Sequence, residues 1–171
     1  RAARGQAIIR DQDTGKRGGW IVDLRGNTGG NMWPMLLGMA PLLRITKDGE
    51  ETVGSFATAE GPSPWQSTPS GVRLGTRVVV DLGAPGYRLK HVGAPVAVLT
   101  GPRTASSGEA TVLALRGRPQ TRSFGEATAG VSTGNVVRPL VDGSSLVLTT
   151  SVMQDRKGKG DGLESTPDQR T

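Results

Sequence analysis

The sequence predicts an α/β fold with a mixed sheet, built from strand-loop-helix units. An apolar run at 19–24 is followed by a glycine cluster at 26–30 and a helical pattern over 31–43, and the same order recurs with 95–100 and 106–116. Consecutive units of this kind place their strands parallel in one sheet. Glycine and proline also make up 37 of the 171 residues, which excludes a coiled coil or an all-helical bundle.

The first residues, 1–13, have the apolar spacing of an amphipathic helix that ends near Gly15, because glycine commonly stops a helix. The chain begins without Met and already inside this helix. We therefore expect it to be a segment of a longer protein that lacks its N-terminal region. Its length predicts a single domain over 1–171.

The segment 45–93 differs in character from the strand-loop-helix units. Its β-rich runs at 51–58 and 77–81 predict short strands, whereas the turn residues at 47–50 and the sequence GPSPW at 61–65 predict irregular loops. We expect a β-rich insertion at about 45–93.

A third glycine-rich loop spans 125–134 and leads into two alternating runs at 136–141 and 145–153. The Asp142-Gly143 pair between these runs is a typical turn of a β-hairpin. Antiparallel strands beside the parallel ones make the predicted sheet mixed.

Composition and charge limit the function classes. The net charge is +6, but the basic residues are scattered and only 156–159 forms a cluster, so we expect no nucleic-acid partner. The absence of cysteine excludes thiol catalysis, disulfides and cysteine-based zinc sites. No apolar run approaches the length of a membrane span. His91 is the sole histidine.

Three loops rich in Gly, Ser and Thr lie at 25–31, 100–107 and 125–134. In open α/β sheets such loops meet beyond the carboxyl ends of the strands, where ligands bind. Their backbone N–H groups favour an anion or an oxyanion. The phosphate-binding motifs G-x-G-x-x-G and G-x-x-x-x-G-K-[ST] do not occur in them, so a nucleotide is not expected.

Ser106 lies at the start of the second predicted helix, directly after an apolar strand and its turn. A hydroxyl placed there suits a nucleophile, because free N–H groups of the helix start stabilise a developing oxyanion. Ser106-x-x-Glu109 is also the pattern of a capping box, and this spacing alone favours the cap. His91 lies in a polar segment, where a solvated histidine is the simpler interpretation.

Three ordered stretches resemble the signature sequences of the tail-specific, or C-terminal processing, serine peptidases of family S41: GWIVDLRGNTGG at 19–30, TASSGE at 104–109 and GEATAG at 125–130. The resemblance covers about 18–168. It implies a ClpP/crotonase-like core, with the insertion covering the cleft, and a hydrolase that needs no metal or organic cofactor. The implied substrate is a C-terminal segment of a peptide or protein. The implied location is outside the cytoplasm, and a membrane anchor would have to precede Arg1.

The resemblance also implies roles for four residues. Ser106 matches the attacking serine, and the backbone N–H of Ser107 matches one donor of the oxyanion hole. The second donor would come from Gly29 or Gly30, whose glycine character allows a close backbone approach.

Departures from the family pattern concern the general base. Val131 stands where many members carry the lysine of a Ser-Lys dyad, and no histidine precedes Asp23, where other members place their base. We therefore expect a histidine from outside this chain to act as base, and residues 1–171 alone to be inactive. Glu164 lies in a stretch similar to one that orients the base in some members, but an inserted Ser-Thr pair interrupts the match, so a surface loop is the alternative.

Two other functions stay open. A non-catalytic peptide-binding module would keep the groove and use Ser106 only as a helix cap. Acyl-thioester chemistry of the crotonase type would use the same fold, and binding of coenzyme A would mark it. A Ser106→Ala variant separates the peptidase from the binding module, because only a peptidase has turnover to lose.

Overall fold

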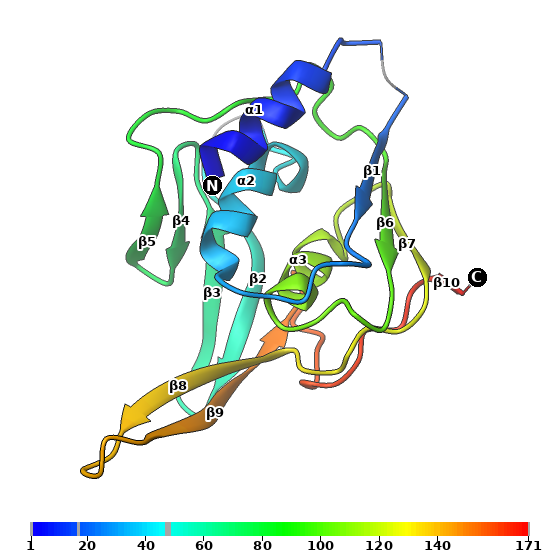
Figure 1. The fold of residues 1–171 in the computed structure, drawn as a ribbon. Helices are drawn as coiled ribbons and strands as arrows, with labels where there is room; N and C mark the ends of the chain where they lie inside the picture. The colour runs from blue at the N-terminus through cyan, green and yellow to red at the C-terminus, as the bar shows by residue number, and fades with distance from the viewer. Residues whose placement is uncertain (1, 17, 47–48, 171) are drawn as a thin grey trace.

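The computed structural model describes residues 2–16, 18–46 and 49–170, which form two sheets with helices packed between and beside them (Figure 1). The first sheet is parallel and has the strand order β1-β6-β7-β10. Its strands are β1 (Trp20–Asp23), β6 (Val96–Thr100), β7 (Thr121–Gly125) and β10 (Gln169–Arg170).

The second sheet is antiparallel and has the order β5-β4-β3-β2-β9-β8. Because β2 pairs with β9, the strands of the expected insertion and the C-terminal hairpin form one continuous sheet. Its strands are β2 (Glu51–Thr58), β3 (Gly61–Ser67), β4 (Gly71–Leu74), β5 (Arg77–Asp81), β8 (Thr133–Pro139) and β9 (Ser145–Gln154).

The helices are α1 (Ala2–Gln12), α2 (Met32–Leu43) and α3 (Ser107–Leu115). Every residue of α3 is buried, because this helix contacts β6 of the parallel sheet and β2 and β9 of the antiparallel sheet. α2 packs on α1 and α3 and supplies Leu36, Leu37 and Leu43 to the core. None of the helices in the described ranges has the length and apolar character needed to cross a membrane.

The α/β class and most of the predicted elements are confirmed, with parallel and antiparallel strands divided between two sheets. β1 and β6 pair in parallel, as the two strand-loop-helix units predicted. The helices predicted at 31–43 and 106–116 and the strands at 51–58 and 77–81 are present. Arg1, part of the predicted N-terminal helix, lies outside the described residues. So do residues 47–48 of the predicted turn at 47–50.

The prediction of an irregular loop at 61–65 is wrong, because these residues begin β3, which pairs with β2 along its whole length. The prolines are tolerated because β4 pairs only with Trp65 to Ser67, which leaves the first half of β3 as an edge. Complete burial of Trp65 favours the strand over a loop.

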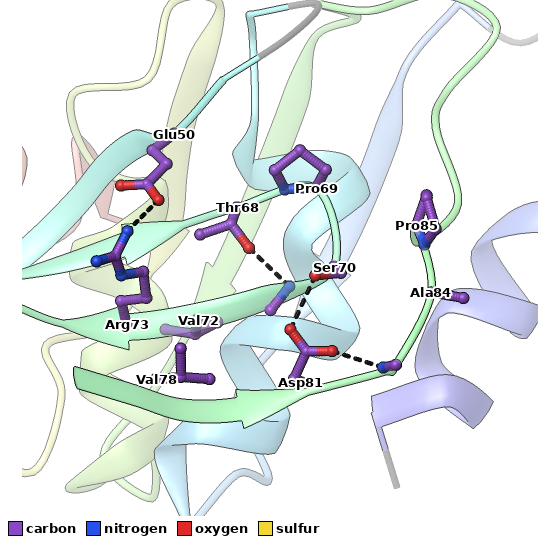
Figure 2. Close-up of a pocket in the computed structure, with 12 residues that line it drawn as sticks. Glu50, Thr68, Pro69, Ser70, Val72, Arg73, Val78, Asp81, Ala84 and Pro85 are labelled. Carbon is purple, nitrogen blue, oxygen red and sulfur yellow. Dashed lines mark hydrogen bonds and ion pairs between the residues drawn. The ribbon is translucent and has the colours of Figure 1, made fainter. Parts of the chain in front are cut away.

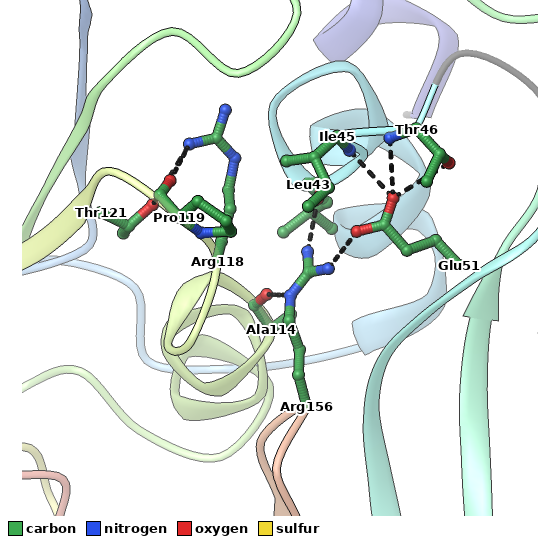
Figure 3. A network of polar contacts seen from close by, with 9 residues as sticks. All are labelled: Leu43, Ile45, Thr46, Glu51, Ala114, Arg118, Pro119, Thr121 and Arg156. Carbon is green, nitrogen blue, oxygen red and sulfur yellow. Dashed lines mark hydrogen bonds and ion pairs between the residues drawn. The ribbon is translucent and has the colours of Figure 1, made fainter.

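Arg156 holds the C-terminal ends of α2 and α3 together (Figure 3). Its guanidinium donates to the carbonyl oxygens of Leu43 and Ala114, the latter at 3.1 Å, and pairs with Glu51. Glu51 also accepts hydrogen bonds from two backbone N–H groups just after α2. A cation at a helix C-terminus interacts favourably with the partial negative charge there. Arg156 does so at two helices and thereby holds them in place relative to each other.

We expect Arg156→Ala to lower the free energy of unfolding by about 3–5 kcal/mol, because it leaves the largely buried carboxylate of Glu51 without its charge partner. Urea denaturation followed by circular dichroism measures this change. Arg4→Ala, on the exposed face of α1, is the matched control and should change stability by less than about 0.5 kcal/mol. Equal effects of the two substitutions would contradict the inference that Arg156 holds the C-terminal ends of α2 and α3 together.

The same network predicts a pH dependence. Burial raises the pKa of Glu51, but hydrogen bonds from the backbone after α2 and the charge of Arg156 lower it further, so that the net pKa is below the ordinary 4.5. A carboxyl group with a lowered folded pKa stabilises the fold at neutral pH and loses this contribution as the pH falls through that pKa. Below pH 4.5 we therefore expect the wild type to lose stability more steeply than Glu51→Gln in urea denaturation. Parallel pH curves would refute this assignment.

Candidate active site

A cleft of about 620 Å³ opens between the starts of α2 and α3 on one side and the antiparallel sheet on the other. Ser106 and Ser107 lie in its wall beside Gly30. Residues of β2, β3, β4 and β5, all within the segment 45–93, contribute to its lining. The other lining residues are Asn31, Met32, Trp33, Phe56, Thr58, Glu60, Ser63, Leu74, Arg77, Thr133, Gly134, Asn135, Val136, Thr150, Ser151 and Met153.

Ser106 has a backbone conformation that side chains rarely adopt. Its φ is 52° and its ψ is −115°, and Gln120 is the only other non-glycine residue in the described ranges with a positive φ. Such a conformation costs of order 1–3 kcal/mol and persists only when the surrounding structure holds it. The sharp turn places Ser106 at the start of α3 and in the wall of the cleft.

The loop after β1 packs directly against this turn. A Cβ atom at Gly29, which has a φ of 108°, would lie 3.0 Å from Ser106 Cβ and 3.4 Å from the backbone nitrogen of Ser107. Only glycine permits this approach. The side chain of Ser107 donates to the carbonyl oxygen of Gly30 and so ties the loop to α3.

The glycine loop and the helix start also provide free N–H groups. The N–H of Gly29 donates to Asn27 Oδ1 at 3.1 Å. For the N–H groups of Gly30 and Ser107, the structure records no hydrogen-bond partner among the described residues. The first N–H groups of a helix have no partner inside the helix, so Ser107 can donate to a group bound in the cleft.

Glu109 connects the Ser106 turn to the third glycine loop. Its fully buried carboxylate accepts from Ser106 N at 2.8 Å and Val131 N at 3.0 Å through Oε2. Through Oε1 it accepts from Thr128 Oγ1 at 2.6 Å and Gly130 N at 2.9 Å. A buried carboxylate is stable when its oxygens are hydrogen-bonded and it lies in the first turn of a helix, where the dipole favours negative charge.

The lining of the cleft is apolar and aromatic where the start of α2 meets the antiparallel sheet. Trp33 at the start of α2 meets Phe56 of β2 edge to face, with ring centroids 6.3 Å apart, and Phe56 meets the buried Trp65 at 4.9 Å. Met153 of β9 lies opposite Phe56 in the sheet. An apolar wall beside a few directed N–H groups is typical of a site that binds an organic molecule.

A model described as peptidase family S41 matches residues 3–170, nearly the whole chain. The chain belongs to peptidase family S41. The nisin-resistance protein of Lactococcus lactis subsp. lactis is 36% identical over 142 residues, which cover 81% of this chain and 41% of that protein.

Solved structures share the S41 fold. A lipoprotein from Streptococcus agalactiae superposes with a TM-score of 0.72 at 32% identity, covering 99% of this chain and 55% of that one. The photosystem II D1 C-terminal processing protease superposes with a TM-score of 0.68 at 22% identity, covering 99% of this chain and 39% of that one. This S41 chain therefore spans about half of the lipoprotein and less of the other two proteins.

The sole histidine of this S41 chain lies away from Ser106. His91 precedes β6 and its Nε2 is 2.8 Å from the carbonyl oxygen of Gly15, which precedes β1. Ser106 follows the opposite end of β6, a strand about 16 Å long at 3.3 Å per residue. Among the described residues that line the cleft, the titratable side chains belong to Glu60 and Arg77. In the described ranges, no three His, Asp or Glu residues are grouped as a metal site requires.

Glu164 lies next to the third glycine loop rather than in the wall of the cleft. Its backbone nitrogen is 3.3 Å from the position that a Cβ atom of Gly130 would occupy. Its side chain is exposed, and within the described ranges the structure records no hydrogen bond or ion pair of its carboxylate. A role in orienting a base stays a prediction.

A second hollow, of about 480 Å³, lies at the β4–β5 end of the antiparallel sheet (Figure 2). Its polar groups bind one another: Ser70 donates to Asp81 at 2.8 Å, Asp81 accepts from Gly83 N, and Arg73 pairs with Glu50. These groups already have partners, which makes this hollow a poorer candidate than the cleft.

Sequence reasoning missed the central position of Glu109 and its bond to Thr128. Glu109 lies in the TASSGE motif and Thr128 in the GEATAG motif. They are 19 positions apart, and only the folded chain shows that they meet. The aromatic wall was missed as well, because Trp33, Phe56 and Met153 come from three distant segments with no shared motif.

We expect Glu109→Gln to lower the free energy of unfolding by about 2–4 kcal/mol, because an amide NH₂ then faces N–H donors that a carboxylate oxygen accepted. Thermal denaturation measures the loss. Glu126→Gln, an exposed carboxylate in the same glycine loop, is the control and should be nearly neutral. A neutral Glu109→Gln would mean that the carboxylate does not hold the Ser106 turn.

Proposed function

We propose that this chain carries the nucleophile and oxyanion hole of a serine endopeptidase of the C-terminal processing type. The observation that carries the proposal is the strained turn of Ser106 at the start of α3, in the wall of a cleft and against Gly29. Strain of this kind gathers at active sites, where it positions a reacting group.

Ser106 Oγ attacks the carbonyl carbon of the scissile peptide bond and gives its proton to a general base. The N–H of Ser107 and the N–H of Gly30 hold the oxyanion of the tetrahedral intermediate. Gly30 is favoured over Gly29 because the N–H of Gly29 already donates to Asn27. The C–N bond then breaks as the base returns the proton to the leaving amine, and water hydrolyses the Ser106 ester by the same route.

The general base is proposed to be a histidine from outside residues 1–171. His91 lies at the other end of β6, and Val131 offers only its N–H, to Glu109. Asp23 is a poor base because its hydrogen bonds with Arg25 lower its pKa to about 2. By this proposal residues 1–171 alone are inactive, and Glu164 orients the base when it is present.

The substrate is proposed to be an extended C-terminal segment of a peptide or protein, with an apolar side chain against Trp33 and Phe56. We place the protein outside the cytoplasm, because the relatives it matches include a lipoprotein and a nisin-resistance protein. No nucleic acid, metal or organic cofactor enters this proposal.

The second candidate is a peptide-binding module without catalysis. One observation favours it: the described residues lining the cleft include no histidine or lysine that could serve as a base. In that function Ser106 serves as the helix cap, and its substitution leaves peptide affinity nearly unchanged.

Labelling with a fluorophosphonate, read by intact mass and peptide mapping, tests the peptidase proposal. We compare residues 1–171 with the complete natural gene product that contains them. One adduct on Ser106 is expected in the gene product, and none in residues 1–171. Ser106→Ala should abolish the adduct, and Ser70→Ala, in the second hollow, should keep it.

The outcomes separate the parts of the proposal. An adduct on Ser106 in residues 1–171 alone would overturn the external base and keep the nucleophile. A gene product that is never labelled at Ser106 would overturn the peptidase and leave the binding module.

A further inference from the structure

The β8–β9 hairpin projects from the body of the molecule (Figure 1). Several of its apolar side chains are exposed. Val137 and Val147 are each 60% exposed, and Leu146 and Leu148 are 44% and 43% exposed. An isolated two-stranded hairpin is at best marginally stable in water, and exposed apolar patches of this kind commonly mark binding surfaces.

The two faces of the hairpin are distinct. Val136 lies opposite Leu148 and Arg138 opposite Leu146, so these four residues share one face, the cleft face. Val137 lies opposite Val147 on the reverse face. The same hairpin therefore offers a test surface and a control surface of similar apolar character.

The cleft face continues the wall of the cleft that contains Ser106. A Cβ atom at Gly134 would lie 2.9 Å from Phe56 Cε1, so position 134 is on the side of the sheet that carries Phe56. The pairing of β8 with β9 shifts between Gly134 and Asn135, but the extra residue, Thr150, lies in β9, so alternation along β8 still puts Val136 and Arg138 on that same side. Val136 itself lines the cleft.

The charged side chain on this face is a cation, Arg138. Arg138 is exposed, and the structure records no ion pair for it among the described residues. The nearest acid along the hairpin, Asp142, lies in the tip turn and accepts from Ser144 N and Oγ. The face thus combines a strip of aliphatic side chains with an unpaired cation.

We propose that the cleft face of the β8–β9 hairpin is a docking surface for the substrate peptide beyond the scissile bond. The occupant is an extended segment with apolar residues at alternate positions and an acidic residue opposite Arg138. The first four residues of β8 already line the cleft, so its last three, about 10 Å at 3.3 Å per residue, extend the docking surface by about three residues of an extended peptide. The inference rests on the proposed function for the direction of the peptide, but its binding step needs no catalysis.

Binding of fluorescein-labelled synthetic peptides to residues 1–171, read by anisotropy, tests this surface. The probes are a 14-residue peptide alternating Val or Leu with Ser and carrying one Asp, the same peptide with Asn for Asp, and its six-residue core. We expect the long Asp peptide to bind at least about tenfold more tightly than the core.

The variants distinguish the two faces. Leu146→Ser with Leu148→Ser should weaken binding of the long peptide about tenfold and leave the core peptide unchanged, whereas Val137→Ser with Val147→Ser should leave both unchanged. Arg138→Gln should remove the preference for Asp over Asn. Circular dichroism melts of the two double variants check that both fold equally well.

Several outcomes would overturn the proposal: no difference between long and core peptides, equal loss in both double variants, or no loss in either. A dimer in sedimentation velocity that Leu146→Ser with Leu148→Ser converts to monomer, without weakening peptide binding, would assign the face to a second copy of the chain. Failure of Ser106 labelling in the gene product would remove the proposed peptidase and leave the binding result standing.

Discussion

The buried carboxylate of Glu109 is the interaction on which the site depends. It lies in the first turn of α3 and accepts hydrogen bonds from the backbone of Ser106 and from the loop that contains Thr128 and Gly130. A buried negative charge can be kept only where donors converge on it, so the third loop must approach the helix start closely. The glycine loop after β1 completes the arrangement through the contact of Gly29 with Ser106.

The opposite ends of the helices are fixed by a second charge. Arg156 binds carbonyl groups at the C-terminal ends of α2 and α3, as Glu109 binds amides at the start of α3. Each charge is opposite in sign to the partial charge of the helix end beside it, so the two attract. α3 is therefore held at both ends between the two sheets, and the cleft keeps its shape with α2 and α3 as one wall and the sheet as the other.

Local pattern was enough to predict the helices and most strands, because apolar periodicity and glycine loops depend on short stretches of chain. The first half of β3 could not be predicted in this way, since its prolines are acceptable only because β4 is short. The motifs around Ser106 and Gly29 identified which loops meet. The aromatic lining depends on the pairing of Phe56 with Met153 in the sheet and on the packing of Trp33 from α2 against Phe56, and the bond between Glu109 and Thr128 depends on loop packing. Neither was visible in the sequence.

The positive φ of Ser106 has an evolutionary consequence. Glycine adopts this conformation without strain, so a chain selected only to bind peptides would gain stability by drifting to glycine at this position. A lineage that had lost its chemistry would have no reason to resist that drift. Serine at this position therefore carries a backbone strain that a glycine would relieve.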